Sequence, residues 1–339
     1  MSDPGLAVYR AQALLDANRP KEALAAVAGA LAREPENPRA LCIQALALLA
    51  LERPNEALDS AVAAVVSDPD GEWGHRIASI ALSRVGRHEQ SIAAGRRAVE
   101  LAPNLALTHM RLALSLLDAQ PPRLADARAA VSHALSLEPD SPEAMRIAGM
   151  VEFRAGRLDD AERHYTRSLS LEPDNAMAVN NLAVVRLRRG RPFDAAVGFA
   201  GAAALDPTLD LARRNIDAAV SRVMRTTHWV MIGGLLGSQV TAPFPLGAVI
   251  ILVYVAALFW WTRRQIPRNL WPYLQRMPIR KPRVGIWLAA GAIAVAVLLA
   301  VPLLPRGDDA GVTFAAYLIY LVGAVISRVG PFTSRRSAA

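Results

Sequence analysis

The stretch that decides the fold reads "GRLDDAERHYTRSLSLEPDN" and spans residues 156–175. It opens on a glycine, which tolerates the left-handed backbone that ends a helix, and near its end stands a proline, which a helix interior excludes. Similar stretches recur along the chain, and their prolines are almost evenly spaced. The separations are 34, 34, 36, 34 and 34 residues, between Pro35, Pro69, Pro103, Pro139, Pro173 and Pro207. A period of this size indicates one supersecondary unit that is stacked several times.

Small residues precede each proline at constant distances. Twelve residues before it stand Ala23, Ala57, Ser91, Ala127, Ala161 and Ala195, and five residues before it stand Ala30, Ala64, Ala98, Ala134, Ser168 and Ala202. Small side chains let two helices approach closely, so we expect these positions at helix crossings. Turn signals such as Gly86-Arg87 separate two helical stretches in most units. Each unit is therefore predicted as a helix, a tight turn, a second helix and a break marked by proline.

With these residues in place, the chain resembles the tetratricopeptide repeat (TPR) family. The resemblance covers residues 4–207 in six units, and Tyr165 and Phe199 match the aromatic position of the second helix. Gly149 matches the small residue of the first helix. The phrases that carry the resemblance are "RPKEALAAVAGALAREPEN", "RPNEALDSAVAAVVSDPD", "GRLDDAERHYTRSLSLEPDN" and "GRPFDAAVGFAGAAALDPT". The resemblance implies an all-α solenoid, whose stacked units build an extended surface.

The sequence departs from the family pattern at several positions. Glu152 and Arg186 stand where the family prefers an aromatic residue, and the fourth unit has two extra residues near 120–122, which predict a longer turn between its helices. The first-helix tryptophan is replaced by Ala7, Leu41, His75, His109, Met145 and Val179. Six units in phase still favour the all-α solenoid.

Residues 208–226 are predicted as a capping helix over the sixth repeat, because a solenoid needs a covered end. The helix has one apolar stripe on an otherwise charged surface. Its members are Leu209, Ala212, Ile216, Ala219 (or Val220) and Val223.

The composition changes abruptly after residue 226. No charged residue occurs from His228 to Trp261, a run of 34 residues, whereas one membrane crossing needs about 20. The run contains "TAPFP" at 241–245, a poor helix interior, so we expect a hairpin of two short spans at 227–242 and 246–262. Two more uncharged stretches predict spans at 284–305 and 311–327. Residues 227–330 are thus predicted as a membrane domain of four helices, followed by a basic tail at 331–339.

The charge of the chain supports this division. Residues 1–226 carry 27 basic and 28 acidic residues, a net charge of −1, whereas residues 227–339 carry 11 and 2, a net charge of +9. Positive residues stay on the cytoplasmic side of a membrane, so the loop 263–283 is predicted to be cytoplasmic and could hold anionic lipid headgroups. Its basic residues are Arg263, Arg264, Arg268, Arg276, Arg280, Lys281 and Arg283. We expect a multi-pass protein of a bacterial inner membrane, with the repeats and the C-terminus in the cytoplasm.

A rival topology has three spans, if residues 228–241 lie in the membrane interface. The repeats would then lie outside the cell. The N-terminus has no basic start followed by an apolar core, so it does not resemble a signal peptide. The lone Cys42 permits no internal disulfide. Both observations favour four spans.

Motifs for catalysis and for metal binding are absent from the sequence. It has no phosphate loop of the P-loop spacing, no H-E-x-x-H and no paired C-x-x-C, and its six histidines lack ligand spacing. We therefore expect no enzymatic activity, no cofactor and no metal. Nucleic acid is not an expected partner, because the basic residues flank the predicted spans and the repeats are slightly acidic.

The resemblance also implies a binding groove, since extended peptides lie along the TPR face that first helices line. Arginine suits carboxylates because its planar fork makes paired hydrogen bonds, and Asn181 resembles residues that hold a peptide backbone. The matching positions are Arg39, Trp73, Arg76, Arg84, Met110, Arg111, Arg146, Met150, Phe153, Arg154, Asn181 and Arg188.

We expect a membrane-anchored adaptor whose groove captures an extended or acidic segment of a protein partner. The alternative is a small transporter that the repeats regulate, but the spans lack the charged residues that coupled transporters use. The identity of the partner and the oligomeric state stay open.

Overall fold

The computed structural model describes residues 4–212, 214–216, 218, 219 and 222, and every regular element among them is a helix. The chain divides into two compact units, Met1–Arg189 and Gly190–Ala339. The helices are α1 (Pro4–Asp16), α2 (Pro20–Leu31), α3 (Pro38–Ala50), α4 (Pro54–Ser67), α5 (Glu72–Arg84), α6 (His88–Leu101), α7 (Ala106–Asp118), α8 (Leu124–Leu137), α9 (Pro142–Arg154), α10 (Leu158–Leu171), α11 (Ala176–Arg188) and α12 (Pro192–Leu205). The first eleven belong to the first unit, and α12 belongs to the second.

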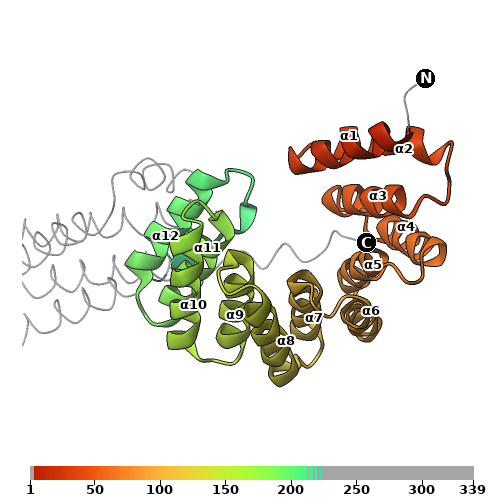
Figure 1. The fold of residues 1–339 in the computed structure, drawn as a ribbon. Helices are drawn as coiled ribbons and strands as arrows, with labels where there is room; N and C mark the ends of the chain where they lie inside the picture. The colour runs from red at the N-terminus through yellow and green to blue at the C-terminus, as the bar shows by residue number, and fades with distance from the viewer. Residues whose placement is uncertain (1–3, 213, 217, 220–221, 223–339) are drawn as a thin grey trace, which may run out of the picture. The chain divides into compact units, whose positions relative to one another are not determined.

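The first unit is a curved stack of helix pairs (Figure 1). Each helix packs against the next one in the chain, and each odd-numbered helix also packs against the next odd-numbered helix. Within the described part of the first unit, successive even-numbered helices do not pack against one another in this way. In a curved stack the elements on the inside lie closest together, so the odd-numbered helices line the inner face. The all-α solenoid that the repeat period predicts is confirmed.

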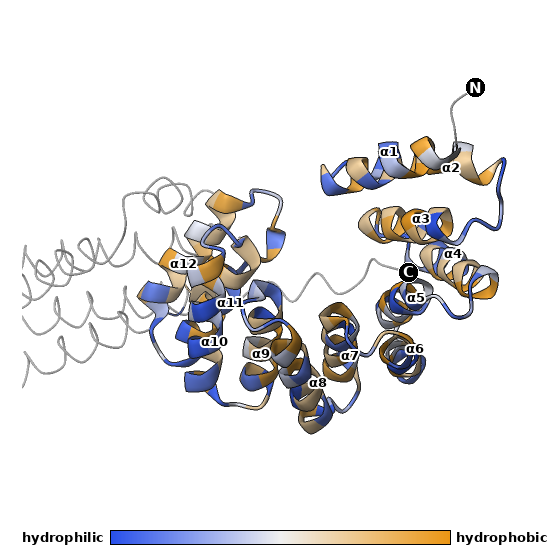
Figure 2. Cartoon of the chain, viewed as in Figure 1, coloured by the Kyte–Doolittle hydropathy of each residue, from blue (hydrophilic) through white to orange (hydrophobic). Residues whose placement is uncertain are grey.

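The small residues ahead of each repeat proline lie where the helices meet. All twelve are at most 1% exposed, whereas charged side chains such as Glu56 and Arg97 lie at exposed positions of these helices. Figure 2 shows the resulting contrast between helices: α3 is hydrophobic over most of its surface and α10 is largely hydrophilic. α3 contacts α1, α2, α4 and α5, and eight of its residues are buried. The prediction that the small positions mark close helix contacts is confirmed.

The turns between paired helices have the predicted chemistry. Gly86 and Gly156 have φ angles of +79° and +76°, and Asn18 and Glu52 occupy the same place with φ of +55° and +57°. Glycine adopts this left-handed region without the steric cost that a side chain brings. These turns have three residues, whereas the turn between α7 and α8 spans residues 119–123. The two extra residues of the fourth unit therefore lengthen its inter-helix turn, as the sequence predicts.

Where the sequence departs from the family pattern, polar contacts take the place of aromatic packing. His75 and His109 replace the first-helix tryptophan, and each places Nε2 within hydrogen-bond distance of the carbonyl oxygen of the preceding repeat proline, at 2.9 Å from Pro69 and 2.7 Å from Pro103. These bonds join the start of each first helix to the break before it. His109 is 7% exposed, so its hydrogen bond is sheltered from water.

A buried charge replaces the aromatic residue at position 152. The Glu152 side chain is 9% exposed, and its two oxygens lie 2.8 Å from Arg128 Nε and 2.5 Å from Arg157 Nε. Arg128 belongs to α8, Glu152 to α9, and Arg157 to the turn before α10. The ion pairs therefore connect α8, α9 and the turn before α10, where the family uses ring packing.

The second unit is described only in part. Phe199 of α12 is fully buried. The described residues from 210 to 222 are helical, and Ala212, Ile216 and Ala219 of the predicted apolar stripe are buried. The capping role of this segment stays a prediction.

Within the ranges given above, no helix is long and apolar enough to cross a membrane. The predicted spans, the basic loop 263–283 and the tail 331–339 lie outside the described residues.

Candidate functional site

The predicted groove arginines fall into two groups in the structure. The first group is engaged by carboxylates. Arg76 pairs with Glu72 at 3.0 Å, and Arg146 pairs with Glu143 at 2.5 Å, each within its own helix. Arg84 reaches Glu52 of the preceding repeat at 3.1 Å, and Arg111 lies 3.8 Å from Asp118.

The second group of groove arginines has no carboxylate partner among the described residues. Arg39 lies over the ring of Tyr9, with its guanidinium carbon 4.8 Å from the ring centre, and Arg188 lies over Phe153 at 5.7 Å. Arg154 is exposed. Contacts between a guanidinium and an aromatic face are worth about 0.5–1 kcal/mol at exposed sites, and they leave the N–H groups available. Arg39, Arg154 and Arg188 are therefore the cations best able to receive an anion.

The other predicted groove residues serve the packing of the stack to different degrees. Trp73 is half-buried against the cores of the first three repeats, and Met110 is 4% exposed inside the core of repeats three to five. Met110 is thus a core side chain and contributes no groove surface. The sulfur of Met150 lies 3.1 Å from Nη1 of Arg146, and Phe153 packs against the core cluster that contains Tyr165. Asn181 is half-buried and accepts a hydrogen bond from Asn180 at 3.4 Å.

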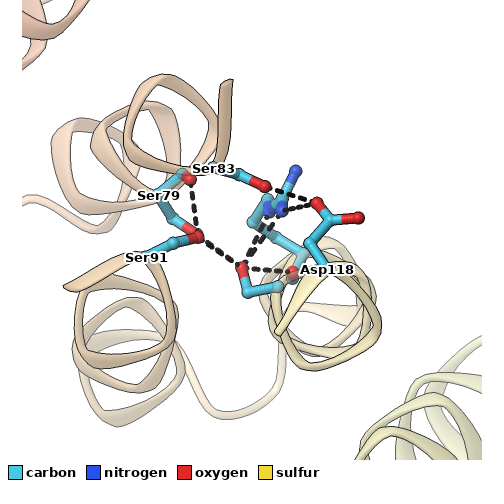
Figure 3. A network of polar contacts seen from close by, with 6 residues as sticks. Ser79, Ser83, Ser91 and Asp118 are labelled. Atoms are coloured by element: carbon cyan, nitrogen blue, oxygen red, sulfur yellow. Dashed lines mark hydrogen bonds and ion pairs between the residues drawn. The ribbon is translucent and has the colours of Figure 1, made fainter. Parts of the chain in front are cut away.

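A serine network supports the middle of the inner face (Figure 3). The hydroxyls of Ser79 and Ser115 lie 2.8 Å apart, and Ser91 donates to the Ser79 carbonyl at 2.8 Å. Arg111 donates from Nε and Nη2 to the Ser115 hydroxyl at 3.3 and 3.1 Å. The Ser83 hydroxyl donates to Asp118. Three helices from two successive repeats, α5, α6 and α7, are therefore joined by one polar network, which the sequence patterns do not reveal.

Arg111 is the buried cation of this network. Its side chain is 11% exposed, and burial lowers the pKa of its guanidinium to about 10, although the charge of Asp118 acts in the opposite direction. A buried charge is tolerated only when it is paired and hydrogen-bonded. Arg111 is thus held inside the stack by Ser115 and Asp118, and its first role is structural.

A cavity of about 520 Å³ lies at the C-terminal ends of α5, α7 and α9. Arg84, Asp118 and Arg154 line it, each of them the last residue of its helix. The lengthened turn supplies Gln120 and Pro122 as part of the wall. The cavity therefore combines two of the predicted groove arginines with the two-residue insertion.

A second cavity, of about 620 Å³, lies over α10, and its arginines are already paired. Arg163 pairs with Asp160, Arg167 with Asp140 at 3.1 Å, and Arg189 with Asp159 at 2.7 Å. The charges at this second cavity are therefore largely satisfied within the protein. The structure, as far as it is described, contains no cluster of three or more histidine, cysteine or acidic side chains that could hold a metal ion.

Comparison with known proteins agrees with the fold. Residues 10–72, 110–168 and 148–210 match the tetratricopeptide repeat model. A thermophilic TPR protein from Thermus thermophilus is 26% identical over 55% of this chain and 100% of its own, with a TM-score of 0.50. The structure of PilW, a widely conserved type IV pilus biogenesis factor, covers 64% of this chain and 98% of its own at 18% identity, with a TM-score of 0.52. The likeness to PilW shows the fold alone.

No curated protein sequence matches the chain significantly. The near-constant spacing of the prolines, the stacked helix pairs and the match to the repeat model identify the chain as a tetratricopeptide repeat protein.

Proposed function

We propose that the chain is a scaffold that binds an extended segment of a protein partner along the inner face of its first unit. The observation that supports this is the group of exposed arginines on odd-numbered helices, Arg39, Arg154 and Arg188, none of which has a carboxylate partner among the described residues. TPR domains bind protein segments, and guanidinium groups without an ion pair attract carboxylates. The preferred segment is therefore acidic.

The size of the inner face sets the length of the segment. Six odd-numbered helices from α1 to α11 contact their neighbours in order. Helices in contact lie about 8–10 Å apart, so the five intervals span about 40–50 Å. An extended chain rises about 3.3 Å per residue, so a segment of about 12–15 residues would cross the whole face.

The second part of the proposal places this scaffold at a membrane. Its support is in the sequence: 34 residues without a charge from His228 to Trp261 and a basic loop at 263–283. In the proposed arrangement, residues 227–330 anchor the chain in the inner membrane with the repeats on the cytoplasmic face. Tethering raises the local concentration of a captured partner without new contacts.

In-cell photo-cross-linking of the full chain tests the scaffold. A photoreactive residue at position 181 on α11 should capture a discrete set of proteins, and one at position 96 on α6 should not, because Arg96 lies on an even-numbered helix. Changing Arg39, Arg154 and Arg188 together to glutamine should remove the capture, whereas changing them to lysine should retain much of it. Capture that is unchanged in the glutamine variant would refute the binding role of these arginines.

Fractionation of the same cells tests the anchor. The full chain should sediment with membranes and resist extraction by high salt or alkaline carbonate. A variant that ends at residue 226 should be released into the soluble fraction. If that variant still sediments with membranes, residues 227–339 are not the anchor.

A further inference from the structure

The cavity at the ends of α5, α7 and α9 carries an unbalanced positive charge. Arg84 and Arg154 line it together with one acidic residue, Asp118. Asp118 is already engaged, since it accepts a hydrogen bond from Ser83 and lies 3.8 Å from Arg111. Its carboxylate therefore already has partners within the protein, although the side chain is 46% exposed.

The two cavity arginines are available to a ligand. Arg84 makes an ion pair with Glu52 at 3.1 Å, but the two side chains are 51% and 82% exposed. Exposed pairs contribute little and exchange easily. Arg154 has no ion pair or hydrogen bond among the described residues. Two guanidinium groups, from repeats three and five, can therefore both reach an anion that enters the cavity.

A third group in the cavity lacks a partner. His88 is the first residue of α6 and lines the same cavity, and its Nδ1 atom is buried without a hydrogen-bond partner within the described part of the chain. Buried polar atoms are nearly always satisfied, so an exception calls for an explanation. Because Nδ1 itself has no exposed surface, a ligand oxygen could reach it only after the imidazole turns, and in its present position His88 contributes to the wall of the cavity.

The wall of the cavity is particular to this repeat. The turn between α7 and α8 has five residues, where the neighbouring pairs have three, and Gln120 and Pro122 of this turn line the cavity. The insertion therefore adds a wall to what is otherwise a row of helix ends, and the cavity stays open to solvent.

We propose that this cavity is the anchor of the bound segment and that it takes the carboxylate of an aspartate or glutamate side chain. The inference rests on the proposed function and adds to it the point at which the bound segment is fixed along the inner face. A carboxylate carries one negative charge, which matches the net charge of one on the lining. A phosphate would bring a second negative charge beside Asp118. An internal side chain fits better than a chain terminus, because Arg188 ends the next odd-numbered helix after Arg154. A segment that continues beyond the cavity can therefore also contact Arg188.

Site-specific cross-linking in the full chain tests the anchor. A photoreactive residue replaces Gln120 in the cavity wall, and a second strain carries it at Asn181, remote from the cavity. Mass spectrometry then maps the residue of the captured protein that each probe reaches. We expect the Gln120 probe to map within about two residues of an internal aspartate or glutamate of the same protein that the Asn181 probe captures.

Substitutions and a peptide complete the test. Arg154→Gln should reduce the yield at Gln120 by about tenfold or more, the loss expected for a charge-assisted hydrogen bond. Arg96→Gln removes an exposed arginine from α6 and should leave the yield unchanged. A peptide of the mapped segment with both ends blocked should bind the purified full chain, and its Glu→Gln or Asp→Asn version should bind about tenfold more weakly.

The possible outcomes separate the anchor from the scaffold. Capture at Asn181 with an unchanged Gln120 yield in Arg154→Gln, or with a mapped segment that lacks an acidic side chain, overturns the anchor and leaves the scaffold. A mapped phosphorylated residue, or a free C-terminal carboxylate, also overturns it. No capture at either position overturns both proposals.

Discussion

Gly149→Ala should destabilise the first unit, although alanine is the better helix former. Gly149 is buried in α9, and a Cβ atom added to it would lie 2.7, 2.8 and 2.9 Å from three carbons of the Tyr165 ring. Carbon atoms in good contact lie about 3.5–4.0 Å apart. The ring is only 2% exposed, so it has no free space into which it can move. The substitution therefore forces α9 and α10 apart.

The magnitude follows from two opposing terms. Overpacking of a core costs about 1–3 kcal/mol, and replacing glycine by alanine inside a helix returns about 1 kcal/mol. The net expectation is a loss of up to about 2 kcal/mol in the free energy of unfolding. Gly29→Ala is the matched control, because Gly29 lies on α2 with nothing within 4 Å of the added Cβ. That variant should gain about 0.5–1 kcal/mol.

The assay compares both variants with the parent full chain by chemical denaturation and by hydrogen exchange. Repeat arrays need not unfold in one step, so exchange in α9 and α10 reports the local effect, and exchange in α2 reports the control. Gly149→Ala should speed exchange in its own pair of helices. Equal stabilisation by the two substitutions would falsify the packing role of Gly149.

Three further perturbations test other parts of the fold. Glu152→Gln should lower the free energy of unfolding by about 1–3 kcal/mol, because it removes the buried carboxylate that pairs with two half-exposed arginines. A loss below about 0.3 kcal/mol in chemical denaturation would contradict this expectation. His109→Ala should cost about 1–3 kcal/mol in the free energy of unfolding, since it leaves the sheltered Pro103 carbonyl without its partner. His75→Ala should cost less, because its hydrogen bond is exposed to water. Equal losses in the two variants would contradict the difference in burial. Burial raises the pKa of the Cys42 thiol to about 12, so its stability contribution is present below the unfolded pKa of about 8.5 and is lost between there and about pH 12. A thiol reagent at pH 8 should accordingly label the native chain far more slowly than the unfolded chain, and equal rates would contradict the burial.

The repeat architecture could be predicted from the sequence because its signals recur. Each proline, each small residue and each turn glycine is a weak signal alone, but six copies in phase exclude most other folds. The same recurrence exposed the two-residue insertion in the fourth repeat. The structure confirms the helix pairs, the buried small positions and the longer turn.

The state of the predicted groove residues could not be deduced in the same way. Arg84 and Arg154 end equivalent helices, yet only Arg84 meets a carboxylate, because its partner Glu52 stands 32 residues earlier in the turn of another repeat. Met110 stands one residue before Arg111 but points into the core. Charge pairing and burial depend on side chains that neighbouring repeats bring together, and the spacing of one residue type does not contain that information.

The serine network joins residues that are close together in the sequence, and this bears on how the chain folds during biosynthesis. Its bond between Ser79 and Ser115 joins residues 36 positions apart, and the other side-chain hydrogen bonds described above span shorter distances. Contacts between residues that are this close in sequence close only small loops, which favours fast folding. Each helix pair can dock on its predecessor as it leaves the ribosome, without waiting for distant parts of the chain. The repeats can therefore fold before the uncharged run that begins at His228 emerges from the ribosome, so that this hydrophobic run follows a folded domain.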